Sequence, residues 1–199
     1  MVRPLMLYLG AIALVTLVAN SATRLRLIAV TFVAIALVAS LIASAAATVP
    51  QVALTFVAGV VAAGILFVAA RDGTYGEDPG WRLWLGTFTA AIVTPLAYAS
   101  FRTVAGEPAT LPLFQDGSGV IVEVAGTWLL SSGVAIMLTA RSAVRVSLAA
   151  LVMVTGVQLL ARLAPEPRLA STLALAWLEV VVALAGAFLI VNERAVRDA

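Results

Sequence analysis

Length, composition and charge place this chain in a membrane. Of its 199 residues, 63% are hydrophobic and 11% charged, whereas soluble domains carry about a quarter charged residues. The net charge is only +2 and its arginines are scattered, which excludes a nucleic-acid partner. His, Cys and Lys are all absent, which excludes imidazole or thiolate ligation, disulfides and Schiff bases. We therefore expect no cofactor, no metal site and no catalytic site of its own.

Seven apolar segments of 16–23 residues are predicted to cross a bilayer, for which about 20 residues are needed. In chain order they are predicted at Pro4–Ala19, Leu27–Thr48, Gln51–Ala70, Trp84–Phe101, Ser118–Ala140, Val144–Leu163 and Leu169–Val191. Pro50 marks a short turn between the second and third, and loops rich in Gly, Pro and Asp flank the fourth. The pattern predicts an all-α integral membrane protein, whose first span is a retained helix rather than a signal peptide.

The arginines predict the orientation, because cytoplasmic loops carry an excess of basic residues. With the N-terminus outside, eight arginines fall in the inner loops and tail and four on the outer side. We therefore expect a multi-pass protein of a bacterial or archaeal cell membrane, with its C-terminus in the cytoplasm. The inner loops hold Arg24, Arg26, Arg141 and Arg145, which we interpret as orientation determinants, with docking of a cytoplasmic partner as the alternative.

An internal repeat relates the two ends of the chain. Residues 9–71 align with residues 130–192 without a gap, and both copies carry the loop pattern A-x-S-A-x-R, ending at Arg24 and Arg145. The shift predicts two parallel three-helix repeats joined by a linking helix, since four spans separate the copies. The corresponding ranges are 1–72 for the first repeat, 73–117 for the linking helix and its loops, and 118–199 for the second repeat with a short cytoplasmic tail.

One carboxylate lies within the last predicted span, in the sequence "LALAWLEVVVALAGAF". Glu179 has no basic residue within a helical turn, and an acid at this depth is costly unless it faces a protein interior and moves ions or protons. The first interpretation of Glu179 is a proton-relay carboxylate, because burial disfavours its charged form. The alternative is a protonated side chain that only fixes helix packing. By depth, Thr155 and Ser131 are its expected neighbours.

A polar stripe follows the fifth span. Glu123, Thr127 and Ser131 recur every four residues and therefore share one helix face. They are candidates for a polar track that leads inward and continues the relay. The alternative, slightly favoured, is that Glu123 reaches water at the interface while the hydroxyls bond their own backbone.

The second repeat resembles a known family. "GVAIMLTARSAVRVSLAALVMVTGVQLLARL" followed by "LALAWLEVVVALAGAFLIVNER" is similar to the three-helix K-type subunit of respiratory complex I. A seven-helix chain with an added N-terminal half looks like membrane component E of hydrogenase-4 and formate hydrogenlyase complexes. The resemblance covers about 65 residues by sequence and the whole chain by layout. It departs from the family pattern in the middle helix, where "LVMVTG" holds no acid.

The resemblance implies a non-catalytic membrane subunit of a complex I-like or hydrogenase-like redox complex that translocates ions. Its partners would be antiporter-like and other membrane subunits within the lipid bilayer, and Glu179 would take the place of the family's acid on the third helix. Two alternatives remain open. One is a small-molecule transporter, or the substrate-binding membrane subunit of an ATP-driven vitamin transporter, with a pocket built from Trp81, Tyr98 and the 102–118 loop. The other is a purely structural assembly factor.

Overall fold

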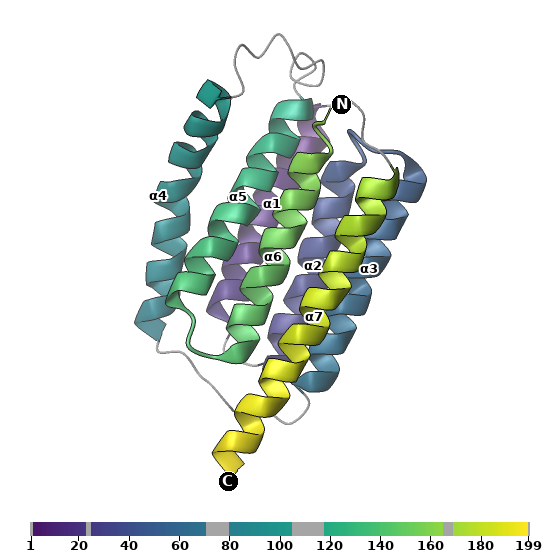
Figure 1. The fold of residues 1–199 in the computed structure, drawn as a ribbon. Coiled ribbons are helices and arrows are strands. Elements are labelled where there is room, and N and C mark those ends of the chain that lie inside the picture. Colours follow the sequence, from purple (N-terminus) through teal and green to yellow (C-terminus); the bar gives the residue numbers. More distant parts are fainter. Residues whose placement is uncertain (1, 23–24, 71–79, 105–117, 165–168, 199) are drawn as a thin grey trace.

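Seven helices form a single bundle in the computed structural model, which describes residues 2–22, 25–70, 80–104, 118–164 and 169–198 (Figure 1). They are α1 (Val2–Ser21), α2 (Leu25–Ala43), α3 (Val49–Ala69), α4 (Gly80–Val104), α5 (Ser118–Thr139), α6 (Ala143–Ala161) and α7 (Leu169–Asp198). By length and composition, α2, α3, α5, α6 and α7 are able to cross a membrane. The predicted all-helical membrane fold is confirmed over the described ranges.

Several helix boundaries differ from the sequence prediction by a few residues, and two of these differences are structurally informative. The predicted turn at Pro50 is instead the first turn of α3, where a proline is tolerated because its missing N–H has no helical partner there. The Thr48 N–H donates to Gln51 Oε1 at 3.1 Å and closes this helix start. The predicted short tail after Val191 is helical through Asp198, so α7 projects beyond the bundle at its C-terminal end (Figure 1).

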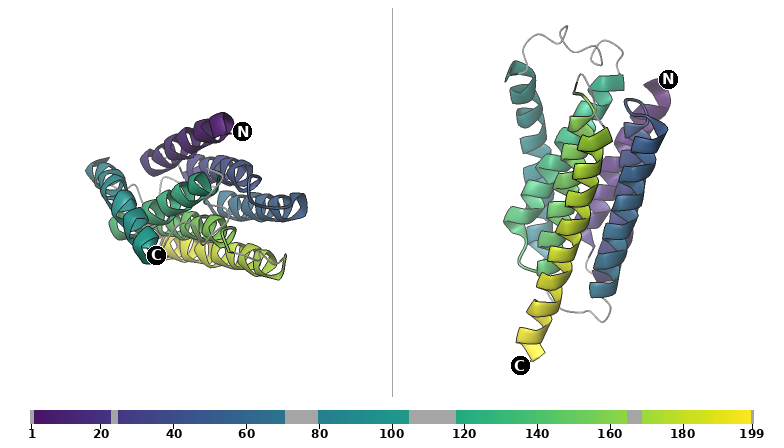
Figure 2. Two further views of the ribbon diagram at one scale, coloured as in Figure 1. Left: turned by 90° about the horizontal axis from the view of Figure 1, so that it is seen from above. Right: turned by 45° about the vertical axis from the view of Figure 1, so that its right-hand side comes forward.

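The helices form two rows that lie face to face. Within the rows, α2 packs against α1 and α3, and α6 packs against α5 and α7. Between the rows, α1 contacts α5, α2 contacts α6 and α3 contacts α7, each pair running in the same direction (Figures 1 and 2). The remaining helix, α4, lies beside α5 and α1 (Figure 2). This layout agrees with the predicted parallel repeats, while the duplication itself stays a prediction.

Small residues bring α5 and α6 together. A methyl group added at Gly156 would lie 2.8 Å from Leu130 N and 2.9 Å from Gly126 O, which are backbone atoms of the neighbouring helix. One added at Gly133 would lie 2.8 Å from Ala149 O. Helices in membranes associate largely through such close packing, because lipid provides no hydrophobic drive between them. The α5–α6 pair is therefore the centre of the bundle.

Burial separates the central helices from the edge helices. The apolar span of α5 is 67% buried within the bundle, whereas the spans of α3 and α7 are 33% and 28% buried. Large apolar side chains on this edge, including Val57, Val68, Trp177, Val181 and Phe188, are more than half exposed. The α3–α7 edge therefore presents an apolar surface to lipid or to neighbouring helices.

Candidate functional site

Glu179 is buried at the junction of α3, α6 and α7. It follows Leu169 by ten residues, or about 15 Å of helix, which is near the middle of a bilayer core of about 30 Å. Its side chain is 1% exposed, and Gln158 Nε2 donates to its Oε2 at 2.9 Å. Gln158 also donates to the Leu175 carbonyl at 3.3 Å. The carboxyl group therefore has a neutral hydrogen-bond donor from another helix as its partner.

A glycine on α3 makes room for this carboxyl group. A methyl group at Gly59 would lie 3.4 Å from Glu179 Oε1 and 2.6 Å from the Ala36 side chain. A real side chain at this position would therefore push α2 and α3 apart and crowd the acid. The small residues Gly59 and Ala36 let three helices close around Glu179.

A small cavity of about 10 Å³ connects Glu179 with polar groups from four helices. This volume is close to the smallest that holds one water molecule. The polar side chains that line it are Ser40, Thr55, Thr155, Gln158, Arg162 and Glu179. The predicted neighbour Thr155 is therefore present at the site, although its hydroxyl donates to the Leu151 carbonyl of its own helix at 2.9 Å.

Arg162 lines the cavity at the end of α6. Its side chain is only 4% exposed, which is unusual for an arginine. Nη1 donates to Thr172 Oγ1 at 2.9 Å, and Nη2 lies 3.4 Å from the Gln51 carbonyl that accepts its hydrogen bond. Arg162 therefore joins α6 to α7 and α3 at the end of the bundle where the chain begins.

The α5 stripe lies apart from Glu179. Glu123, Thr127 and Ser131 are all buried, but α5 packs against α6, α4, α1 and α2, whereas α7 packs against α3 and α6. The prediction that Ser131 would be a neighbour of Glu179 is wrong in that Ser131 does not line its cavity. The reason is that the two rows pair α3, not α5, with α7.

The structure contradicts one part of the favoured alternative for the stripe and agrees with another part. Glu123 is 0% exposed, so it does not reach water as the favoured alternative expected. Thr127 does bond its own backbone, donating to the Glu123 carbonyl at 2.8 Å. Near the stripe, the buried Ser132 and the partly buried Trp128 line a second cavity of about 10 Å³ between α1, α4 and α5.

The predicted topology arginines have different environments. Arg145 is 3% exposed, and its two terminal nitrogens donate to the Asn20 and Ala22 carbonyls at 2.7 Å each. It therefore holds the end of α1 and is not accessible for docking. Arg26 and Arg141 are exposed, and Arg26 stacks on Phe67 with its guanidinium 5.7 Å from the ring centroid. Arg24 lies outside the described residues.

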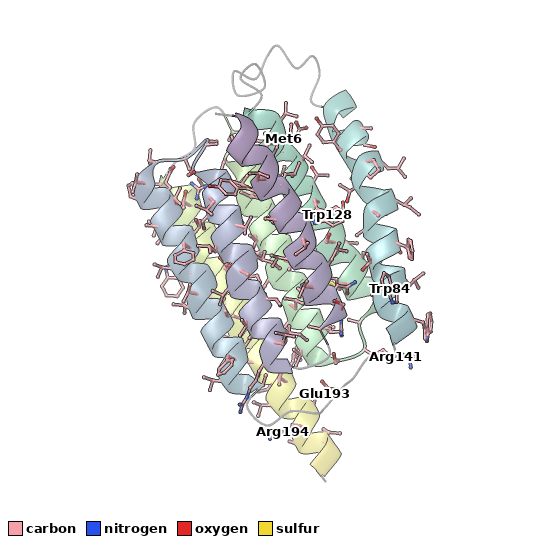
Figure 3. The ribbon with its side chains drawn as sticks, turned by 180° about the vertical axis from the view of Figure 1, so that it is seen from behind. Met6, Trp84, Trp128, Arg141, Glu193 and Arg194 are labelled. Carbon is pink, nitrogen blue, oxygen red and sulfur yellow. The ribbon has the colours of Figure 1, made fainter. Side chains whose placement is uncertain are left out.

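The end of the bundle that holds Arg145 is further tied by α7. Glu193 Oε2 accepts a hydrogen bond from the Ala143 N–H at 2.8 Å, so a carboxylate from α7 caps the first turn of α6. Glu193 and Arg194 lie where α7 leaves the bundle, and Arg141 lies at the same end, nearer to α4 (Figure 3). The contact of Arg145 with the Ala22 carbonyl places the end of α1 at this same end.

The pocket expected for a carrier is not assembled from its two named aromatic residues. Trp81 and Tyr98 lie near opposite ends of α4, separated by 17 residues, or about 25 Å of helix. They cannot line one small site because they lie too far apart along the same helix. The third component, the 102–118 loop, lies largely outside the described residues.

Two site residues, Gln158 and Arg162, were missed by the sequence analysis. Their signal was present, because Thr155, Gln158 and Arg162 are spaced by three and four residues and therefore share one face of α6. Among the described residues, no group of three or more His, Cys, Asp or Glu side chains is placed to hold a metal ion. The arrangement is suited to holding a proton or a water molecule.

No protein-family model matches this chain, and no curated protein or solved structure matches it either. The function therefore has to be argued from the fold and from the Glu179 site.

Proposed function

We propose that this chain is a non-catalytic membrane subunit of an ion-translocating redox complex of the complex I or hydrogenase-4 kind. In this proposal Glu179 is a proton-relay carboxylate and Gln158 holds it in place. The support comes from the seven-helix apolar bundle, from the resemblance of the second repeat to K-type subunits, and from the chemistry of the Glu179 site.

The buried Glu179–Gln158 pair is the observation that carries the proposal. A carboxyl group in a low-dielectric interior exchanges between neutral and charged forms with small changes in its surroundings. Gln158 offers an N–H donor that stabilises the carboxylate and also an amide oxygen that accepts a hydrogen bond from the neutral acid. This partner tolerates both protonation states, whereas an arginine at the same place would fix the charged one.

The size of the cavity favours a proton over a small-molecule cargo. Organic ligands occupy pockets of about 300–1,000 Å³, whereas the Glu179 cavity measures about 10 Å³. A larger hollow of about 210 Å³ between α3 and α7 lies on the apolar edge and is lined by Leu54, Val57, Ala58, Val61, Leu173, Ala176, Trp177 and Val180. A further hollow of about 340 Å³ lies beside α2 and α3, and its only polar side chains are Ser40 and Ser44. Neither hollow has the several polar groups, all directed at one ligand, that orient a substrate. The transporter alternative is therefore the weaker proposal.

The expected partners follow from the exposed α3–α7 edge. In the proposal, antiporter-like subunits cover part of this apolar edge, lipid covers the rest, and the N-terminus lies outside the cell. Purifying the tagged chain from its native membrane and identifying the proteins that remain bound tests this arrangement. Recovery of antiporter-like and redox subunits supports it, while recovery with an ATPase pair supports the vitamin-transporter alternative.

Glu179→Gln tests the proton role directly. Gln keeps the size and the hydrogen-bonding capacity of the side chain but cannot take up a proton at neutral pH. We expect the complex to assemble normally and to pump fewer protons per electron in sealed vesicles. Glu193→Gln is the matched control, since it makes the same change on the same helix at the end of the bundle. Unchanged pumping by Glu179→Gln would show that Glu179 is a packing residue.

A further inference from the structure

The polar groups that line the Glu179 cavity lie toward one end of the bundle. On α6, Gln158 and Arg162 lie beyond Thr155 in the direction in which the helix runs, toward the end that carries the N-terminus (Figure 1). On α3, Thr55 lies in the second turn from that same end. Arg162 then reaches Thr172 in the first turn of α7. A polar seam thus extends from Glu179 to the N-terminal end between α2, α3, α6 and α7.

The other side of Glu179 is closed by an apolar layer. This layer consists of side chains that are 0–1% exposed and belong to one continuous core: Ala62, Leu66, Leu148, Leu151 and Ala183. They come from α3, α6 and α7, which are three of the four helices that also form the polar seam. Below Glu179 the same helices therefore bury only hydrocarbon over about two turns.

Close helix contacts keep water out of this layer. A methyl group at Gly186 on α7 would overlap the side chain of Ser147 on α6 and would lie 3.5 Å from Leu66 on α3. The nearest hydroxyl groups on that side are bound within their own helices: Ser147 donates to the Ala143 carbonyl, and Thr31 donates to the Ile28 carbonyl. Neither hydroxyl bridges toward Glu179.

We propose that Glu179 exchanges its proton with water only at the N-terminal end of the bundle, through the polar seam that ends at Arg162. A proton from that side adds to the Glu179 carboxylate and gives the neutral acid, and its loss to the same side restores the carboxylate. The apolar layer blocks the route to the C-terminal end within this chain. With the predicted orientation, the open side faces the outside of the cell. This inference rests on the proposed proton role of Glu179, but the access of water to the seam is measured independently of proton pumping.

Thiol accessibility tests the inference, because the chain contains no cysteine of its own. Ser40→Cys and Thr155→Cys place a thiol of similar size in the polar seam, while Leu66→Cys and Leu148→Cys place one in the apolar layer without overpacking. Each full-length variant is exposed to silver nitrate in chloride-free buffer, in right-side-out and in inside-out membrane vesicles. The thiols left unreacted are then counted with a fluorescent maleimide after denaturation.

We expect silver ions added at the N-terminal side to block the two seam thiols about tenfold or more faster than the two layer thiols, because thiol reactivity follows access to water. Added at the C-terminal side, silver should leave all four thiols largely unreacted. Equal protection of seam and layer thiols, or faster reaction from the C-terminal side, would overturn the inference. If the seam thiols react only from the N-terminal side but Glu179→Gln pumps normally, the water path is supported and the proton role of Glu179 is rejected. If the seam thiols are protected from both sides but Glu179→Gln pumps fewer protons, the proton role is supported and the water path is rejected.

Discussion

The two rows of helices bury different kinds of polar groups. Among the described residues, the row of α1, α2 and α3 buries only neutral ones, namely Thr16, Asn20, Thr31, Ser40, Gln51 and Thr55. The facing row of α5, α6 and α7 buries four ionisable side chains, Glu123, Arg145, Arg162 and Glu179. The two rows therefore have the same arrangement of three helices, but only the second row buries ionisable side chains among the described residues.

The first row provides hydrogen-bond acceptors and space for the ionisable side chains of the second row. Arg145 is bound by the Asn20 and Ala22 carbonyls at the end of α1, and Arg162 by the Gln51 carbonyl of α3. Glu179 fits beside Gly59, where the first row has no side chain. The first row thus contributes backbone oxygens and space, and the second row contributes the charges. Four substitutions test this division.

Arg145→Ala should have the largest effect. It leaves two buried carbonyls at the end of α1 without their charged donor, and each buried polar group left unsatisfied costs about 1–3 kcal/mol. We expect a marked fall in the thermal unfolding midpoint in detergent. Arg26→Ala is the control, since Arg26 is exposed and the loss of its stacking on Phe67 should cost only about 0.5–1 kcal/mol. Equal midpoints for the two variants would contradict the supporting role of α1.

Gly59→Ala should have the next largest effect, because its methyl group would lie 2.6 Å from the Ala36 side chain. Overpacking of this kind costs about 1–3 kcal/mol, measured as a lower unfolding midpoint. Gly64→Ala is the matched control on the same helix, since nothing lies within 4 Å of its added methyl group. A Gly59 variant as stable as the Gly64 variant would show that α3 does not shape the Glu179 site.

Gln158→Leu should have a smaller effect on stability. It removes the 2.9 Å hydrogen bond to Glu179, and interhelical hydrogen bonds in membranes contribute about 0.6–1.7 kcal/mol. Repeating the change in a Glu179→Leu background sharpens the result, because removing both partners leaves no unsatisfied group. We expect the Gln158 substitution to cost less in that background. Equal losses in both backgrounds would mean that the two side chains do not interact.

Glu193→Ala should have the smallest effect, since it acts within the second row. It removes the carboxylate that accepts from the Ala143 N–H, and loss of a helix cap costs about 1 kcal/mol. Asn192→Ala, one residue away and exposed, is the control. Amide exchange at Ala143 is the most direct measurement, and it should become faster in the Glu193 variant alone.

The fold could be predicted from the sequence because lipid imposes a simple length rule on apolar helices. All seven helices were predicted, although by length and composition only five of them are able to cross a membrane. The largest boundary error was at α7, where the helix continues to Asp198 through charged residues that favour helix in water. Glu179 could also be identified from the sequence, because a single acid within an apolar span is rare and costly. Gln158 and Arg162 were missed because glutamine and a terminal arginine are ordinary at helix ends, although their spacing from Thr155 places all three on one helix face.

The sequence by itself determined the helical class, the spans and the unusual position of Glu179, because these depend on composition and local spacing along one segment. Only the tertiary structure decided which side chains meet. It placed Gln158 rather than Ser131 beside Glu179, and it buried Arg145 and Arg162 against backbone carbonyls. The physical reason is that α7 packs against α3 and α6, an arrangement set by the close approach of small residues on different helices. This close fit depends on pairs of residues from different helices, so it cannot be predicted from any one segment of the sequence.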